Sequence, residues 1–220
     1  MKAKFMKKIF LLSILALGLG ISGQAHADYS EMFKNEIMQE LLNTTSSSQG
    51  KSYEKSSLTF TQDGSTDGLE TLVATYPKSQ QKEIRASLKQ LYDSFPQVAH
   101  SVGIPTNDLS SAVAAVIAGA YMAYNNISLN DDYVKPMANQ FKAHLENSGF
   151  FDGMSNREKK SMYDQMVMVG MTLAVGQSLN QSNPNSQTTV QLREAGKQIL
   201  EAILKVDADR VRITAQGISY

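Results

Sequence analysis

Apolar residues recur at helical spacing through most of the second half of the chain. The spacing predicts helices over residues 79–100, 109–126, 131–147, 155–180 and 187–206. The second and fourth of these are apolar on nearly every face, which is typical of helices buried at the centre of a bundle. The pattern therefore predicts a mainly α fold, a single bundle-like domain of about five helices around two apolar central helices.

Small residues indicate how the two central helices pack. Ala115, Gly119 and Ala123 recur every four positions in the first, and Gly170 and Ala174 have the same spacing in the second. Four-residue spacing places such residues on one side of a helix, where a neighbouring backbone can approach closely. We therefore expect the two central helices to be packing partners.

Local signals set two of the helix ends. Ser155 and Glu158 have the spacing of a capping box, so a helix is expected to begin after Ser155. Pro96 lacks the N–H that an interior helical position needs, and it is expected to end or kink the 79–100 helix near Phe95.

Two short segments have the alternating pattern of strands rather than helices. They are "LTFTQ" at residues 58–62 and the tail around residues 211–215. We expect them to pair in a small two-stranded ribbon on the helical domain.

The first 27 residues have the pattern of a secretory signal. A lysine-rich start precedes the apolar run "IFLLSILALGLGI", and Ala25 and Ala27 supply the small residues of a cleavage site. An apolar run of this length rises about 20 Å as a helix, which is too short to span a bilayer. We expect cleavage after Ala27 and a periplasmic or secreted protein.

The region after the signal divides into an arm and a linker. Residues 30–42 have a helical apolar stripe, and Phe33, Ile37 and Leu41 on it are candidates for docking on a protein partner. Docking of this helix on its own domain is the alternative, and the pattern favours it. Residues 43–57 contain eight Ser or Thr in fifteen positions and have little apolar surface to bury. The predicted organisation is a signal at 1–27, an amphipathic helix and linker at 28–62, and a helical domain at 63–220.

Composition excludes several classes of protein. There is no cysteine, so disulfides and a lipid-modified cysteine are excluded, and stability must come from the core. The chain has 21 basic and 21 acidic residues, and loss of the four lysines of the signal would leave a net charge of −4. A mildly acidic chain lacks the basic surface that nucleic acid requires. We also expect no stable membrane insertion of the mature chain.

One stretch, "TQDGSTDGLE" at residues 61–70, has part of a calcium-binding pattern. Asp63, Ser65 and Asp67 fall on the first, third and fifth positions of an EF-hand loop. The twelfth position, where a bidentate glutamate belongs, is Ala74, and no helix-forming sequence precedes the loop. A polar turn between linker and domain is favoured, with weak calcium binding as the alternative.

Two other chemistries have weak support. His100 and His144 are the histidines of the mature chain, and neither lies in a nucleophile elbow or a zinc-protease motif. A hydrolase would have to assemble one of them with dispersed carboxylates. Four methionines could in principle bind Cu(I), but Met is a common core residue; they are Met162, Met166, Met168 and Met171. We predict no catalytic residues and no cofactor.

Four segments together resemble a bacterial domain of unknown function. They are "YPKSQQKEIRASLKQLYDSF", "GIPTNDLSSAVAAVIAGAYMAYNN", "MSNREKKSMYDQMVMVG" and "LREAGKQILEAILKVDADRVRITAQGIS". The resemblance covers roughly residues 70–218. It implies an exported, mostly helical domain and brings no known activity.

The sequence favours a non-enzymatic binding or interaction protein of the cell envelope or exterior. A periplasmic inhibitor or immunity protein is one concrete form of this hypothesis. The alternatives are the hydrolase with His100 or His144, and a membrane-active toxin that uses the apolar helix at 109–126.

Overall fold

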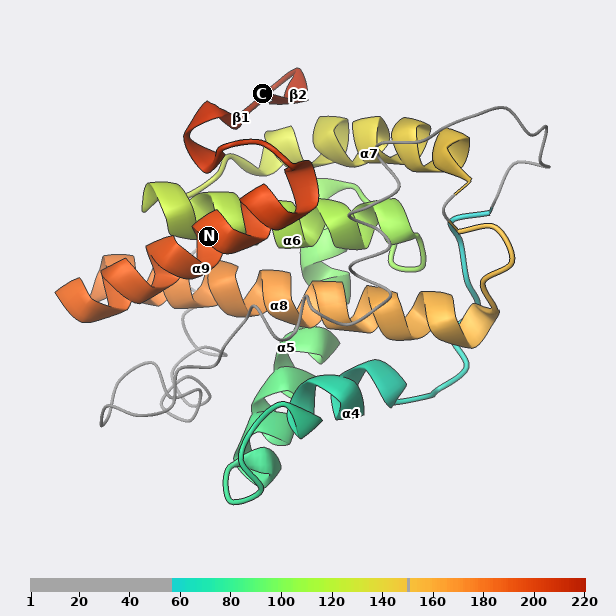
Figure 1. Ribbon diagram of the computed structural model, residues 1–220, viewed down its shortest axis with the longest axis horizontal. Helices are drawn as coiled ribbons and strands as arrows, with labels where there is room; N and C mark the ends of the chain where they lie inside the picture. Colours follow the sequence, from blue (N-terminus) through green and yellow to red (C-terminus); the bar gives the residue numbers. More distant parts are fainter. Residues whose placement is uncertain (1–56, 150) are drawn as a thin grey trace.

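The computed structural model describes residues 57–149 and 151–220, which form a mainly α fold as predicted (Figure 1). The α-helices are α4 (Asp67–Ala74), α5 (Gln81–Val102), α6 (Leu109–Asn125), α7 (Val134–Ser148), α8 (Asn156–Ser182) and α9 (Ser186–Leu204). Two 3-10 turns, η3 (Asp131–Tyr133) and η4 (Ala208–Arg210), precede α7 and the strands β1 (Arg212–Thr214) and β2 (Gly217–Ser219). The five expected helices are all present, and α4 was not predicted.

Helices α6 and α8 form the centre of the fold and run in the same direction. Gly119 of α6 lies against Gly170 of α8, and a Cβ added at Gly170 would lie 2.5 Å from the carbonyl oxygen of Ala115. Further along, the side-chain amide of Gln177 donates to Asn126 Oδ1 at the end of α6. The predicted pairing of the two apolar helices is confirmed, and glycine permits the backbone contact.

Helix α9 packs on another side of α6. Gly196 of α9 lies against the backbone of Ala120 and Tyr124, and Arg193 stacks over the Tyr124 ring at 5.2 Å. Because α9 returns from the far end of α8, it lies antiparallel to both central helices (Figure 1).

Helix α5 continues past Pro96, so of the end or kink predicted near Phe95 the end does not occur. It reaches Val102, and Gly103 then closes it with a φ of 73°. Phe95 and Ala99 on either side of the proline are buried, so the apolar face continues through it. Packing of that face outweighs the hydrogen bond that Pro96 cannot make.

The predicted ribbon exists and its first strand lies in the expected tail, but the partner strand is different. Strand β1 pairs antiparallel with β2, and Ile213 lies opposite Ile218. Thr59 of the other expected strand instead forms an isolated antiparallel bridge with Asp108. A tight turn with Gly217 at a φ of 101° brings β2 beside β1, and this local pairing closes a shorter loop than a partner at residue 59 would.

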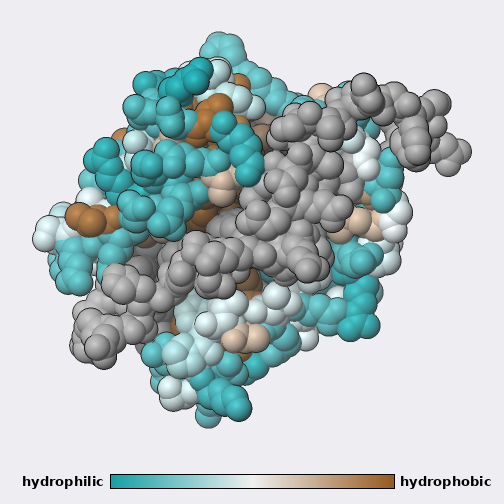
Figure 2. All heavy atoms as spheres, in the orientation of Figure 1, coloured by the Kyte–Doolittle hydropathy of each residue, from teal (hydrophilic) through white to brown (hydrophobic). Residues whose placement is uncertain are grey.

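The described surface is mainly polar. Hydrophilic residues cover most of the coloured face in Figure 2. The large apolar residues that are exposed among the described ones are Ile127, Val190 and Tyr220. In residues 57–149 and 151–220, no helix combines the length and the apolar character needed to cross a membrane.

Candidate functional site

The most elaborate polar structure in the described residues surrounds the N-terminal ends of α6 and α8. Because these helices are parallel, both ends lie on the same side of the molecule (Figure 1). Residues 57–61, which we call the strap, lie against them. A turn at residues 62–66 connects the strap to α4. The strap therefore joins the helical domain to the arm and linker that precede it in the sequence.

The strap is held at its main chain by the segment that leads into α6. Leu109 N donates to Leu58 O at 3.1 Å, and Phe60 N donates to Asn107 O at 3.1 Å. The side-chain amide of Asn107 also donates to Phe60 O at 3.3 Å. These bonds lie on either side of the bridge between Thr59 and Asp108, so the strap pairs antiparallel with residues 107–109 over this short stretch.

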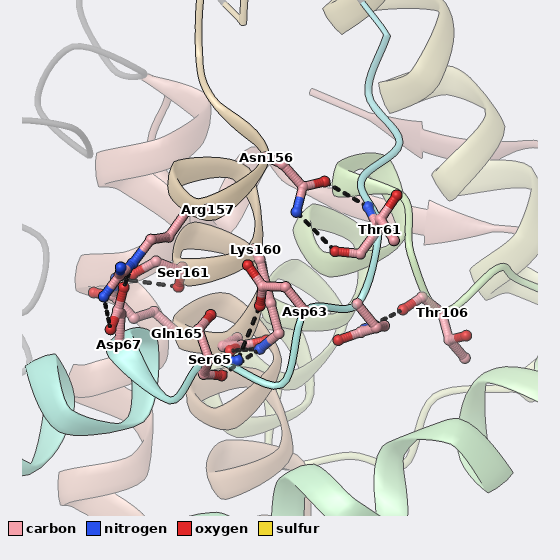
Figure 3. A network of polar contacts seen from close by, with 12 residues as sticks. Thr61, Asp63, Ser65, Asp67, Thr106, Asn156, Arg157, Lys160, Ser161 and Gln165 are labelled. Atoms are coloured by element: carbon pink, nitrogen blue, oxygen red, sulfur yellow. Dashed lines mark hydrogen bonds and ion pairs between the residues drawn. The ribbon is translucent and has the colours of Figure 1, made fainter.

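Helix α8 holds the strap from its own first residues. Thr61 N donates to Asn156 Oδ1 at 2.6 Å, and Asn156 Nδ2 donates to Thr61 O at 2.8 Å (Figure 3). Lys159 Nζ donates to Ser57 O at 2.6 Å. All three interactions involve the strap's main chain, so they are independent of its side chains.

Two apolar side chains anchor the strap in the core. Leu58 is 2% exposed and Phe60 is 5% exposed. The Phe60 ring lies 4.8 Å from the ring of Tyr163, which in turn contacts Phe95 of α5. The core therefore begins upstream of residue 63, where the sequence analysis placed the start of the helical domain.

A buried ion pair lies behind the strap on α8. Lys160 Nζ donates to Asp164 Oδ2 at 2.6 Å, and both side chains are about 95% buried. The same ammonium donates to Ser65 O at 2.8 Å and lies 5.7 Å from the centre of the Tyr92 ring. Lys160 therefore joins α8 to the turn after the strap and to α5.

The electrostatics of this pair reflect its burial. Burial raises the pKa of the Asp164 carboxyl, and the hydrogen bonds from Lys160 and Tyr92 oppose that shift without cancelling it. Burial also raises the pKa of the Tyr92 and Tyr163 hydroxyls. The Lys160 ammonium is buried against a carboxylate, a carbonyl and an aromatic ring, so the arrangement fixes the turn rather than presenting an amine to solvent.

The turn with the partial calcium pattern is held by the protein itself. Asp63 Oδ1 accepts from Ser65 N at 2.9 Å, and Asp67 starts α4 and accepts from Arg157 Nη2 at 2.9 Å (Figure 3). The carboxylates of Asp63 and Asp67 thus have partners within the protein. Within the described ranges, no group of three or more metal-binding side chains lies in position to share an ion.

The other candidate residues do not come together. His100 on α5 and His144 on α7 are both exposed, so neither imidazole lies in a buried pocket. The four methionines of the copper alternative are core residues, each at most 7% exposed. Phe33, Ile37 and Leu41, the candidates for partner docking, lie outside the described residues, as does the predicted signal.

Sequence reasoning missed the residues that build this site. Asn156, Lys160 and Asp164 were not singled out. The last two carried a usable signal, because they lie four residues apart at the start of an otherwise apolar helix and so share one face. Asn156 carried none, since an asparagine in the first turn of a helix is common in many settings.

Comparison with known proteins gives a family without an activity. No curated protein and no solved structure matches the chain significantly. A family model, described as "Family of unknown function (DUF6683)", matches residues 7–220. The match covers nearly the whole sequence and agrees with the resemblance to a domain of unknown function. The chain therefore belongs to this family of unknown function, DUF6683.

Proposed function

We propose that the protein is exported and that its helical domain is a non-enzymatic platform from which the upstream segment at residues 28–56, the arm together with its linker, docks on a protein partner. The observation that carries the proposal is the strap, which fixes the downstream end of the arm at the N-terminal ends of α6 and α8. The strap thereby connects the arm directly to the two central helices of the fold.

Two sequence features support the same reading. The lysine-rich, apolar first 27 residues followed by Ala27 favour export with cleavage at that point. The apolar stripe that contains Phe33, Ile37 and Leu41 has the spacing with which amphipathic helices fill grooves of partner proteins.

Export is tested on the full-length protein in its host. Fractionation followed by N-terminal sequencing should give a chain that begins at Asp28 in the periplasm or medium. A cytoplasmic chain that still carries Met1 would refute this part of the proposal.

Docking is tested by capture from envelope extracts. The mature chain 28–220 is compared with a truncated chain 57–220, which keeps the strap, and with the variant Phe33→Asp/Ile37→Asp/Leu41→Asp. The control is Asn35→Asp/Gln39→Asp/Asn43→Asp, which adds the same charge at the same spacing, with Asn35 and Gln39 on the opposite helical face and Asn43 directly after the predicted helix.

The expected result is a stoichiometric partner that the mature chain and the control capture and that the other two lose, with all four melting at similar temperatures. A large loss of thermal stability in the truncated chain would show instead that the arm packs on its own domain. Capture that survives the truncation would also contradict arm docking.

A further inference from the structure

The strap is a separable unit within the fold. Its side chains alternate, with Leu58 and Phe60 buried and Ser57, Thr59 and Thr61 exposed. What holds it is a pair of apolar side chains and a set of hydrogen bonds to its main chain. The binding surface for it, which we call the slot, consists of residues 107–109, Asn156, Lys159 and the ring of Tyr163.

The segment that joins the strap to the rest of the domain is a short turn. Residues 62–66 connect it to α4, and the turn contains Gly64 at a φ of 74° with open space around its Cα. Lys160 Nζ donates to Ser65 O of this turn at 2.8 Å, and Gln62 Nε2 donates to Thr106 O at 3.4 Å. Upstream, the sequence is rich in Ser and Thr. The strap is thus followed by a turn of mainly exposed residues and preceded by a sequence with few apolar residues.

We propose that the strap is exchangeable and that the slot of one copy binds residues 57–61 of a second copy. Every strap contact would form in the same way in the exchanged pair, because the slot recognises main chain and two apolar side chains without regard to which copy supplies them. Only the turn at 62–66 would change conformation. Exchange of an identical element between copies is a low-cost route to a closed two-fold dimer.

The occupant is a second copy rather than an unrelated peptide because the slot already fits this segment. Leu58 and Phe60 are both at least 95% buried in it, and Lys159 meets the Ser57 carbonyl at 2.6 Å. Within one chain the short turn keeps the strap at a high effective concentration, so the single-chain form dominates in dilute solution. The exchanged form should therefore increase with protein concentration.

The absence of cysteine makes a direct test available. A tagged full chain with Ser57→Cys is mixed with an untagged full chain with Lys159→Cys, incubated at increasing concentration and treated with a short bismaleimide. In the control mixture Lys82→Cys, at an exposed lysine of α5 outside the slot, replaces Lys159→Cys. A chain with both Ser57→Cys and Lys159→Cys reports the single-chain form.

The expected result is a covalent heterodimer that increases with concentration, exceeds the Lys82→Cys control several-fold and disappears when the tagged chain also carries Leu58→Asp/Phe60→Asp. A heterodimer yield equal to that control at every concentration, with cross-linking confined within the doubly substituted chain, would overturn the proposal. Failure of the doubly substituted chain to cross-link would overturn it as well, because the strap would then not occupy the slot.

Discussion

The side-chain amide of Asn156 binds the main chain of Thr61 in both directions, as a neighbouring strand would. Gln140 of α7 does the same at the other end of the domain, where its Oε1 accepts from Ile218 N at 2.6 Å and its Nε2 donates to Ile218 O at 3.3 Å. At each extended end of the helical domain, the hydrogen-bonding groups of one main-chain residue are thus paired with a side-chain carboxamide from a helix. Such a pairing supplies a donor and an acceptor at the spacing that a peptide unit requires.

We predict that Asn156→Ala weakens the strap locally. Loss of two hydrogen bonds should lower the free energy of unfolding by about 1–2 kcal/mol and speed amide hydrogen exchange at Thr61. Gln140→Ala is the matched control, since it removes the same kind of pairing from Ile218. Exchange at Thr61 should be unchanged in that control, and equal effects of the two variants at Thr61 would contradict a local role for Asn156.

The ion pair between Lys160 and Asp164 gives a second prediction, made with a double-mutant cycle. Lys160→Met leaves a buried carboxylate without its cation, and Asp164→Leu leaves a buried ammonium without its anion. Each should lower the free energy of unfolding by about 3–5 kcal/mol at neutral pH, whereas Lys160→Met/Asp164→Leu should cost clearly less than the sum of the two. Urea denaturation measures all four proteins, and additive losses would contradict the pairing.

The contribution of Asp164 to the free energy of unfolding also depends on pH, and the sign of this dependence follows from the direction of its pKa shift. The pKa of Asp164 is raised in the folded protein, so the native state binds a proton at higher pH than the unfolded state does. Its contribution to stability is therefore greatest at low pH and falls as pH rises through the interval between the two pKa values. In Lys160→Met the isolated carboxyl should be protonated more readily still. The stability deficit of this variant should shrink on acidification.

The contact between α6 and α8 gives a third prediction. Gly119→Ala would place a methyl group against the carbonyl oxygen of Gly170, and backbone atoms cannot move aside as a flexible side chain does. The overlap should outweigh the gain in helix propensity and lower the free energy of unfolding by about 1–3 kcal/mol. Ser178→Ala, at an exposed position of α8, is the control and should leave stability within about 0.5 kcal/mol. Equal stability of the two variants would contradict the close packing.

The helical part of the fold was predictable because its periodicity is long and strong. The pairing of α6 with α8 followed from small residues at four-residue spacing, and the start of α8 followed from the capping box at Ser155 and Glu158. Helix α4 was missed because its eight residues begin inside a turn-like sequence, where Asp67 and Gly68 suggest no helix. Tertiary contacts of Leu69 and Leu72 with the core decide that segment.

The site was less predictable because it depends on contacts between distant residues. Thr61 and Asn156 are 95 positions apart, and no local pattern in either segment points to the other. Lys160 and Asp164 were detectable as a charged pair on an apolar helix, but the carbonyl of Ser65 that completes the ammonium's coordination was not. The acidic residues of the turn that resembled a calcium loop have structural roles instead. Asp63 accepts a hydrogen bond within the turn, and Asp67 pairs with Arg157.

The pair formed by Asp67 and Arg157 gives the last prediction. Arg157 hydrogen bonds to the Asp67 carboxylate and holds its pKa below the ordinary value of 3.8. Because the folded pKa lies below the unfolded one, this group stabilises the protein above the unfolded pKa and loses that contribution as pH falls through the folded pKa. In Arg157→Gln the pKa of Asp67 should return toward 3.8, as followed by the NMR shift of its carboxyl carbon.

The pair is exposed, so salt and water screen it and its effect on global stability should be small. The melting temperatures of Arg157→Gln and the wild type should differ most near neutral pH and converge in acid, where Asp67 is protonated in both folded and unfolded states. Glu70, held in the same way by Arg85, is the internal reference, because its pKa should not change in this variant. An unchanged Asp67 titration would contradict the role of Arg157 and leave the charge of Lys160 as the cause of the lowered pKa.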